Sequence, residues 1–135
     1  MIFADTTLLI DFLRGKQEAK EIIEENKELC TSEINAYELF MGIHNKREQE
    51  VQKQRVQGLL QAVVVFPFER QAAEKAAEIT ADLERKGERI GQIDAMIAAT
   101  AIVNKIKVIY TENTNHFARI QELEVKKHRK STKRL

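Results

Sequence analysis

Four short apolar runs constrain the fold of this chain more than any other feature of its sequence. They occupy residues 2–4, 29–30, 63–66 and 108–110, and three of the four are rich in β-branched or aromatic residues. Runs of this length and composition, bounded by polar residues, are typical of buried β-strands. We therefore expect four strands of a few residues each.

The segments between these runs have the period of α-helices. Ala19, Ile22 and Ile23 mark one helix, and residues 48–62 form a second, more polar one. A third helix ends at Gly87 and carries an apolar stripe. The stripe consists of Ala72, Ala76, Ile79 and Leu83. Strands that alternate with helices imply an α/β fold with a mainly parallel sheet covered on both faces, in which ligands bind at the carboxyl ends of the strands.

The charge of the chain is distributed unevenly along its 135 residues. Six of its 22 lysines and arginines follow the last acid, Glu124, which leaves 16 bases against 21 acids in residues 1–125. The length fits one domain, which we assign to residues 1–125. We expect the basic tail at residues 126–135 to be disordered. Such a tail either holds the phosphate groups of a nucleic acid or serves as a solubilising terminus.

Composition excludes several classes of protein. The longest apolar runs are far shorter than a membrane span, and the first residues lack the basic region of a secretory signal. We therefore expect a cytoplasmic protein with no membrane partner. The single cysteine, Cys30, excludes an internal disulfide, and we interpret it as a small buried hydrophobic residue.

Three acidic residues follow or interrupt the apolar segments. Asp5 directly follows the first strand, where it either binds a metal ion or caps the next helix. Asp94 precedes an almost wholly apolar helical segment, so it is either a helix cap or a carboxylate held at the edge of the core. Glu38 lies within an apolar helical turn, where capping cannot explain it. It faces solvent, pairs with a base or meets a cation.

A parallel sheet would bring these three carboxylates to one edge. Together they predict a site for magnesium or manganese, which prefer oxygen ligands, and the chain offers no matching histidine or thiolate set for zinc. The polar residues 111–117 follow the fourth strand at the same edge. Among them, His116 either binds metal or substrate or is a surface or capping group.

Four motifs, in their order and spacing, resemble those of PIN domains of the VapC type. The motifs are Asp5-Thr6, Glu38-Leu39 with Gly42, Gly91-x-x-Asp94-Ala95-x-Ile97-Ala98-Ala99-Thr100-Ala101, and Thr111-x-Asn113-x-x-His116-Phe117-x-x-Ile120. The resemblance extends from Met1 to about Val125. It implies a three-layer α/β/α domain, commonly a homodimer, that cleaves RNA and is neutralised by a VapB-like antitoxin.

The resemblance also implies roles for single residues. Asp5, Glu38 and Asp94 match the metal-binding acids of the family. The chain departs from the pattern at Asn113, where many members have aspartate, and at Gln92, where a further acid is frequent. The site therefore has three carboxylates at most, which bears on whether it holds a second metal ion.

From these residues we predict metal-assisted hydrolysis of RNA phosphodiester bonds, with water as the nucleophile and magnesium or manganese held by the three acids. Thr6 and Thr111 are expected to hydrogen-bond the carboxylates, and Asn113 to donate to a phosphate or to ligate weakly. Glu112 is expected to point elsewhere if the strand before it continues.

Single-stranded or looped RNA is the expected substrate class. Six basic residues near the motifs are candidates for phosphate contacts, and solvated surface charge is the alternative for each. They are Arg14, Lys16, Lys46, Arg47, Lys86 and Arg89. An antitoxin is expected to lay an apolar segment in a groove beside the site, with residues 18–25 and 48–62 as candidate walls.

Two other functions fit the same residues. One is a PIN-fold RNA-binding or scaffold module that is catalytically weak or inactive, suggested by Asn113. The other is a housekeeping nuclease of RNA maturation, with the same site and no antitoxin. Metal binding distinguishes the first from an enzyme, and an adjacent gene for a small DNA-binding protein distinguishes the second from a toxin.

Overall fold

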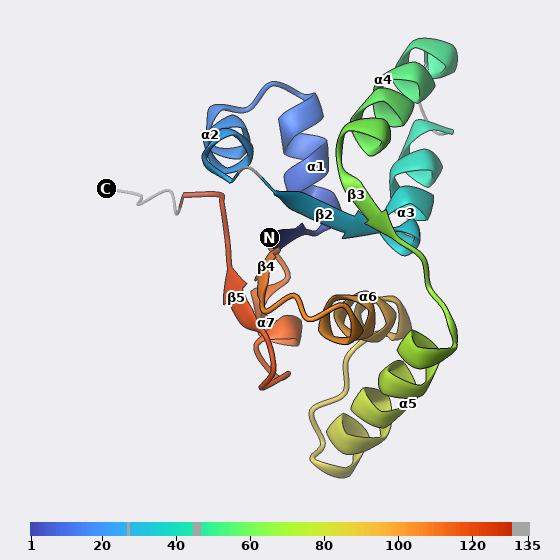
Figure 1. Ribbon diagram of the computed structural model, residues 1–135, viewed down its shortest axis with the longest axis vertical. Helices are drawn as coiled ribbons and strands as arrows, with labels where there is room; N and C mark the ends of the chain where they lie inside the picture. Colours follow the sequence, from blue (N-terminus) through green and yellow to red (C-terminus); the bar gives the residue numbers. More distant parts are fainter. Residues whose placement is uncertain (27, 45–46, 131–135) are drawn as a thin grey trace.

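The strand β1 (Ile2–Ala4) lies at the centre of a five-stranded sheet in the computed structural model, which describes residues 1–26, 28–44 and 47–130 (Figure 1). All neighbouring strands are parallel, in the order β3-β2-β1-β4-β5. The other strands are β2 (Leu29–Ser32), β3 (Val64–Phe66), β4 (Val108–Tyr110) and β5 (Glu124–Lys126). The chain therefore extends the sheet from β1 to β3 on one side and then returns to the other side of β1.

Seven helices connect the strands within the described residues, and none of them is long and apolar enough to cross a membrane. They are α1 (Thr6–Leu13), α2 (Gln17–Glu25), α3 (Glu33–Ile43), α4 (Gln49–Ala62), α5 (Arg70–Arg85), α6 (Gln92–Val103) and α7 (Thr114–Phe117). The first four cover one face of the sheet and the last three cover the other (Figure 1). The predicted three-layer α/β/α architecture is confirmed.

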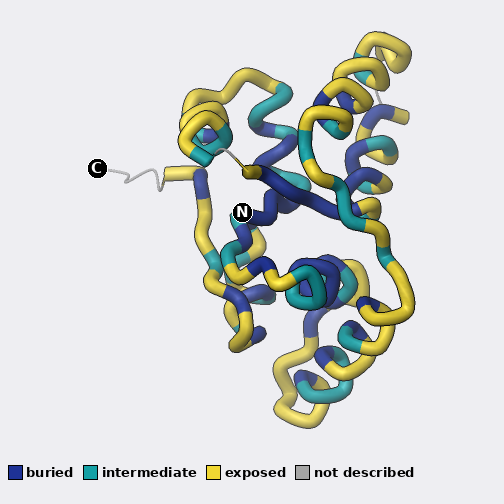
Figure 2. The backbone as a smooth tube through the Cα atoms, in the orientation of Figure 1, coloured by how far each residue is buried: buried dark blue, intermediate teal, exposed yellow. Residues whose placement is uncertain are grey.

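Two cores form because successive residues of a strand face opposite sides of the sheet. Phe3 and Ile109 pack with the helices α5, α6 and α7, whereas Ile2 and Ala4 pack with α1 to α4. The strands β1 and β2 are buried throughout, and most helices carry buried residues between exposed ones (Figure 2). Cys30 is fully buried in the first of these cores, as predicted.

The four predicted strands are confirmed, and β2 extends two residues further than expected, to Ser32. The helix α5 also ends as predicted. Gly87 has a φ of 68°, and the amides of Gly87 and Glu88 donate to the carbonyls of Glu84 and Leu83 at 3.1 and 2.8 Å. This left-handed backbone conformation is the usual end of a helix and favours glycine.

The prediction of a disordered tail is wrong for residues 126–130. Lys126 lies in β5, and its carbonyl accepts a hydrogen bond of 2.9 Å from the amide of Thr111. His128 is buried, and Arg129 binds Asp11 of α1. Basic composition suggested disorder because the contacts that order this segment come from other parts of the chain: from β4 and Glu112, and from Asp11, which lies more than 100 positions earlier. Residues 131–135 lie outside the described part of the chain.

We expect Leu8→Ala to lower the free energy of unfolding by about 2–5 kcal/mol, because Leu8 is fully buried and its loss leaves a cavity. Urea unfolding at pH 7 measures this change. The matched control is Val51→Ala, since Val51 is 53% exposed and should change stability by less than about 0.5 kcal/mol. Equal losses in the two variants would contradict the packing of α1 on the sheet.

Candidate functional site

Asp5 lies at the carboxyl end of β1, beside the point where the chain changes direction across the sheet. Its Oδ1 accepts hydrogen bonds of 2.9 Å from the Thr6 amide and from Nδ2 of Asn35, and its Oδ2 accepts one of 2.6 Å from the Thr111 hydroxyl. The capping interpretation is therefore correct, because Asp5 is the N-cap of α1. The same carboxylate also receives donors from two other elements, which capping alone does not require.

Glu38 projects from the middle of α3 and is half-buried. Its Oε1 accepts a 2.6 Å hydrogen bond from the Thr6 hydroxyl, and that hydroxyl accepts one of 3.0 Å from Nδ2 of Asn35. Thr6 and Asn35 thus connect the carboxylates of Asp5 and Glu38. Of the three alternatives for Glu38, pairing with a base is not observed among the described residues.

Asp94 lies in the first turn of α6, where Gly91 and not Asp94 is the N-cap. The capping interpretation of Asp94 is therefore wrong. Its Oδ2 accepts a 2.6 Å hydrogen bond from Nδ2 of Asn113 and lies 2.9 Å from Nδ1 of His116. His116 is thus neither a cap nor an isolated surface group, since it contacts one of the candidate acids.

The three carboxylates are close enough to influence one another's ionisation. Burial raises the pKa of Asp5, and the charge of Asp94 adds to this effect. Burial also raises the pKa of Glu38, with smaller contributions of the same sign from Asp5 and Asp94. The charges of neighbouring acids thus contribute to the raised pKa of both Asp5 and Glu38, as expected for a site of negative potential.

The chemistry of these donors fits a hard divalent cation. Within the described residues, every ion pair formed by a lysine or arginine involves some other carboxylate. In the same part of the chain, no three His, Cys, Asp or Glu side chains are spaced for direct coordination of one ion. Magnesium usually keeps several of its waters, so direct ligation by every acid is not required.

Asn35 and Ser32 also support the site, and neither was identified from the sequence. Asn35 is fully buried and bonds both Asp5 and Thr6, and its Oδ1 accepts a 2.6 Å hydrogen bond from the Ser32 hydroxyl. A signal for Asn35 exists, because it lies three residues before Glu38 in an otherwise apolar helical turn. Residues with this spacing share one face of a helix.

The residues after β4 alternate between the two faces, as the strand pattern predicts. Thr111 reaches Asp5 and Asn113 reaches Asp94, whereas Glu112 points to the opposite side and accepts a 3.0 Å hydrogen bond from the His128 amide. The predicted hydrogen bonds of Thr6 and Thr111 to the carboxylates are confirmed. Asn113 contributes a donor to Asp94 where a carboxylate would contribute further negative charge.

Those of the six basic candidates that the structure describes form no ion pair with the three acids. Arg14 and Lys16 follow the far end of α1, about 12 Å along the helix from Asp5 at 1.5 Å per residue, and Lys16 lies 3.7 Å from Asp11. Arg89 is paired with Glu84 at 3.2 Å and lies just before α6. Arg47 and Lys86 are exposed beyond the ends of α3 and α5, and Lys46 lies outside the described residues.

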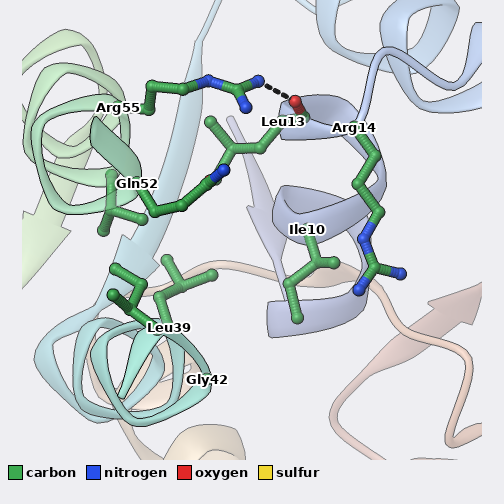
Figure 3. A pocket seen from close by; sticks show the side chains of 9 residues that line it. Ile10, Leu13, Arg14, Leu39, Gly42, Gln52 and Arg55 are labelled. Atoms are coloured by element: carbon green, nitrogen blue, oxygen red, sulfur yellow. Dashed lines mark hydrogen bonds between the residues drawn. The ribbon is translucent and has the colours of Figure 1, made fainter. Parts of the chain in front are cut away.

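A hollow of about 430 Å³ lies between α1, α3 and α4. Its apolar lining includes Ile10 and Leu39, which lie on opposite sides of it (Figure 3). Arg55 of α4 reaches across to donate to the carbonyl of Leu13, and Arg14 lies at the rim. Leu39 directly follows Glu38, so the hollow begins next to the acidic edge.

Comparison with known proteins gives a consistent assignment. A family model described as PIN domain matches residues 2–123. The tRNA(fMet)-specific endonuclease VapC of Salmonella typhimurium is 31% identical over 123 residues, which cover 90% of this chain and 92% of the relative. Ribonuclease VapC19 of Mycobacterium tuberculosis is 30% identical over 128 residues, which cover 92% of this chain and 98% of the relative.

The solved structure of DNA-bound VapBC from Salmonella typhimurium superposes with a TM-score of 0.84 and 29% identity. The superposition covers 93% of this chain and 96% of that chain. The family match includes β1 to β4 and all three candidate acids. On these similarities the chain belongs to the PIN-domain family and, within it, to the VapC ribonucleases.

Proposed function

We propose that this chain is a metal-dependent endoribonuclease and the toxin of a toxin–antitoxin pair, with Asp5, Glu38 and Asp94 as its active site. The observation that carries the proposal is the shared set of neutral donors around these acids. Thr6 and Asn35 connect Asp5 to Glu38, and the segment after β4 reaches both Asp5 and Asp94. The names of the relatives, which are ribonucleases and endonucleases, support an enzyme over an inactive binding module.

Magnesium or manganese, when bound by the three acids, supplies a Lewis acid for the scissile phosphate and lowers the pKa of a water nucleophile. The residues of the chain prepare this arrangement. The hydroxyls of Thr6 and Thr111 hold the carboxylates of Glu38 and Asp5 in fixed orientations. Asn113 and His116 both contact Oδ2 of Asp94 and would orient this carboxylate for a bound cation. Because Asn113 stands in place of a fourth acid, we propose that the site holds a single metal ion tightly.

RNA with an exposed backbone is the proposed substrate, and the cytoplasm is the proposed place of action. The acidic site does not attract phosphates by itself, so bases must offset its charge. Arg89 is the best placed of the six basic candidates, because it immediately precedes the segment that leads to Asp94. A housekeeping nuclease would share all these features, and an antitoxin is what separates a toxin from it.

We expect Asp94→Asn to reduce metal-dependent RNA cleavage by at least about 100-fold while the fold is retained, because one of three ligands for the cation is lost. The assay is cleavage of a mixed RNA pool with magnesium, with manganese and with chelator. The matched control is Asp82→Asn on α5, whose carboxylate pairs with Arg85 at the surface. This control should cleave as the wild type does. Undiminished cleavage by Asp94→Asn would exclude Asp94 from the active site.

We expect Glu38→Gln to raise the melting temperature of the metal-free protein. An acid with a raised folded-state pKa destabilises the fold above its unfolded value, here 4.5, because it ionises more readily in the unfolded chain. The amide removes this cost at pH 7 and can still accept the hydrogen bond from Thr6. Added manganese should then stabilise the variant less than the wild type.

Thermal denaturation in chelator and in manganese measures both effects. Glu24→Gln, on the exposed side of α2, is the control and should respond to the metal as the wild type does. A lower melting temperature for Glu38→Gln in chelator would show that the carboxylate is stabilised in the fold without a cation.

We further propose that a VapB-like antitoxin lays an apolar segment in the hollow between α1, α3 and α4. The hollow is apolar inside and carries Arg14 and Arg55, which suit an antitoxin segment with acidic ends. A neighbouring hollow of about 480 Å³ lies between α1, α2 and α4 and shares Leu13 and Arg55 with the first. The predicted wall at residues 48–62 lines both hollows, and the predicted wall at residues 18–25 lines only the second. The homodimer implied by the family stays a prediction.

Two glycines allow these hollows to be filled separately. A side chain at Gly42 would enter the first hollow and one at Gly58 the second, and a Cβ at either position meets no atom within 4 Å. We expect Gly42→Phe to weaken binding of the proposed VapB-like antitoxin by at least about 10-fold, and to leave RNA cleavage by the free toxin intact. Calorimetry with Gly42→Phe and Gly58→Phe measures this. A loss confined to Gly58→Phe would move the antitoxin segment to the second hollow.

A further inference from the structure

A second buried polar cluster, separate from the candidate acids, joins α1 to the residues that follow β5. Asp11 of α1 is fully buried, and its Oδ2 is 2.7 Å from Nε2 of His128. Arg129 donates to both oxygens of Asp11, at 2.8 and 3.0 Å. The Arg129 guanidinium and the neighbouring histidine hold the pKa of Asp11 well below its usual range. Asp11 is therefore charged throughout the neutral range, and it fixes residues 128–129 against α1.

The other side of His128 faces the loop after β4. Its amide donates to Oε2 of Glu112 at 3.0 Å, and its Nδ1 lies 3.3 Å from the same oxygen. His128 is only 6% exposed, so this contact is shielded from solvent. The contacts of Glu112 and Asp11 with His128 therefore form a chain, which we call the Glu112–His128–Asp11 clasp.

The clasp acts on the loop of residues 111–113, two of which bond candidate acids. Thr111 bonds Asp5, Glu112 bonds His128, and Asn113 bonds Asp94. Three successive side chains thus fasten this loop to three different partners. Glu112 is the only one of the three that does not touch an acid, yet its fixation limits how far its two neighbours can move.

The helix α1 takes part at both of its ends. Asp5 caps its first turn and accepts from Thr111, and Asp11, six residues later, binds the residues that hold Glu112. The same helix and the same loop are therefore connected twice, through Thr111 and through the clasp. Two connections between two elements remove rotations that a single hydrogen bond would leave open.

We infer that Glu112 and His128 are positioning residues of the nuclease, which hold Thr111 and Asn113 in place so that Asp5 and Asp94 meet the cation in a fixed geometry. The inference rests on the proposed function. Neither residue touches substrate or metal, and both act through the loop between them and the acids. Second-layer contacts of this kind typically change metal affinity or activity by 10–100-fold.

The test uses Glu112→Ala, which separates the loop from the clasp and leaves the contacts of Asp11 with His128 and Arg129. We expect the manganese concentration for half-maximal RNA cleavage to rise by about 10-fold, with KM for RNA within about twofold. Glu112→Gln keeps an oxygen that can accept from the His128 amide, and it should recover most of the wild-type response. A role in stability alone would lower the melting temperature and leave the manganese response unchanged.

The control is Glu122→Ala, which removes the 2.7 Å ion pair with Lys75 near β5 and has no contact with the loop. It should keep the wild-type manganese response even if it melts earlier. An equal shift of that response in Glu112→Ala and Glu122→Ala would overturn the inference, because the effect would then follow stability.

A readout without catalysis separates failure of this inference from failure of the proposed nuclease. The amide of Asn113 donates to the Thr111 hydroxyl at 3.0 Å, so its hydrogen exchange reports the order of the loop. Exchange at Asn113 should accelerate in Glu112→Ala and not in Glu122→Ala, whether or not any RNA is cut. Cleavage that Asp94→Asn does not reduce would refute the proposed active site alone, whereas unchanged exchange in Glu112→Ala would refute the clasp.

Discussion

The hydrogen bond from Thr111 to Asp5 joins β4 to β1 at the point where the sheet changes its direction of growth, and the rest of the site depends on it. Parallel strands that diverge from such a point leave an opening between their carboxyl ends. Asp5 occupies this opening because it directly follows β1 and is also the N-cap of α1. A buried carboxylate in that position needs donors, and hydrogen bonds to a charged group are worth about 1.5–3 kcal/mol each.

The donors around the acids are neutral, and this choice affects both stability and chemistry. A lysine or arginine would neutralise the carboxylates and make the fold more stable, but it would also occupy the place of a cation. Hydroxyl and amide groups orient the oxygens without removing their charge. The protein therefore keeps three acids with mutually unfavourable charges close together, which costs stability and favours binding of a cation.

Most of the fold was predicted from local sequence patterns, namely the short apolar runs of the strands and the helical segments that alternate with them. The four apolar runs, the stripe of α5 and the stop at Gly87 depend on neighbours within a few residues, and all are found in the structure. The acids Asp5 and Asp94 were placed correctly at one edge because parallel topology follows from the alternation of elements. Their local roles were harder to predict. Because the N-cap of α6 is Gly91, Asp94 is not the cap of that helix.

What the sequence could not indicate depends on distant pairs. The segment around β5 is basic and has one apolar residue, Val125, so its sequence does not predict a strand. The strand forms because it pairs with β4 and because Asp11 binds Arg129 just after it. Asn35 was missed for a similar reason, since its role is defined by Asp5, 30 positions earlier. Local pattern identifies elements, whereas the partners of buried polar groups are set by the tertiary fold.

The great sequence separation of these contacts has a consequence for synthesis of the protein. Thr111 and Asp5 are 106 positions apart, and His128 and Asp11 are 117 apart. Domains generally fold from the N-terminus during translation, but these two contacts cannot form before Thr111 and His128 have been synthesised. During synthesis, Asp5 and Glu38 can already be connected through Thr6 and Asn35, whereas the hydrogen bond from Thr111 to Asp5 is still absent. The complete site, and any nuclease activity that depends on it, therefore arises only after the segment that follows β4 has been added to the chain.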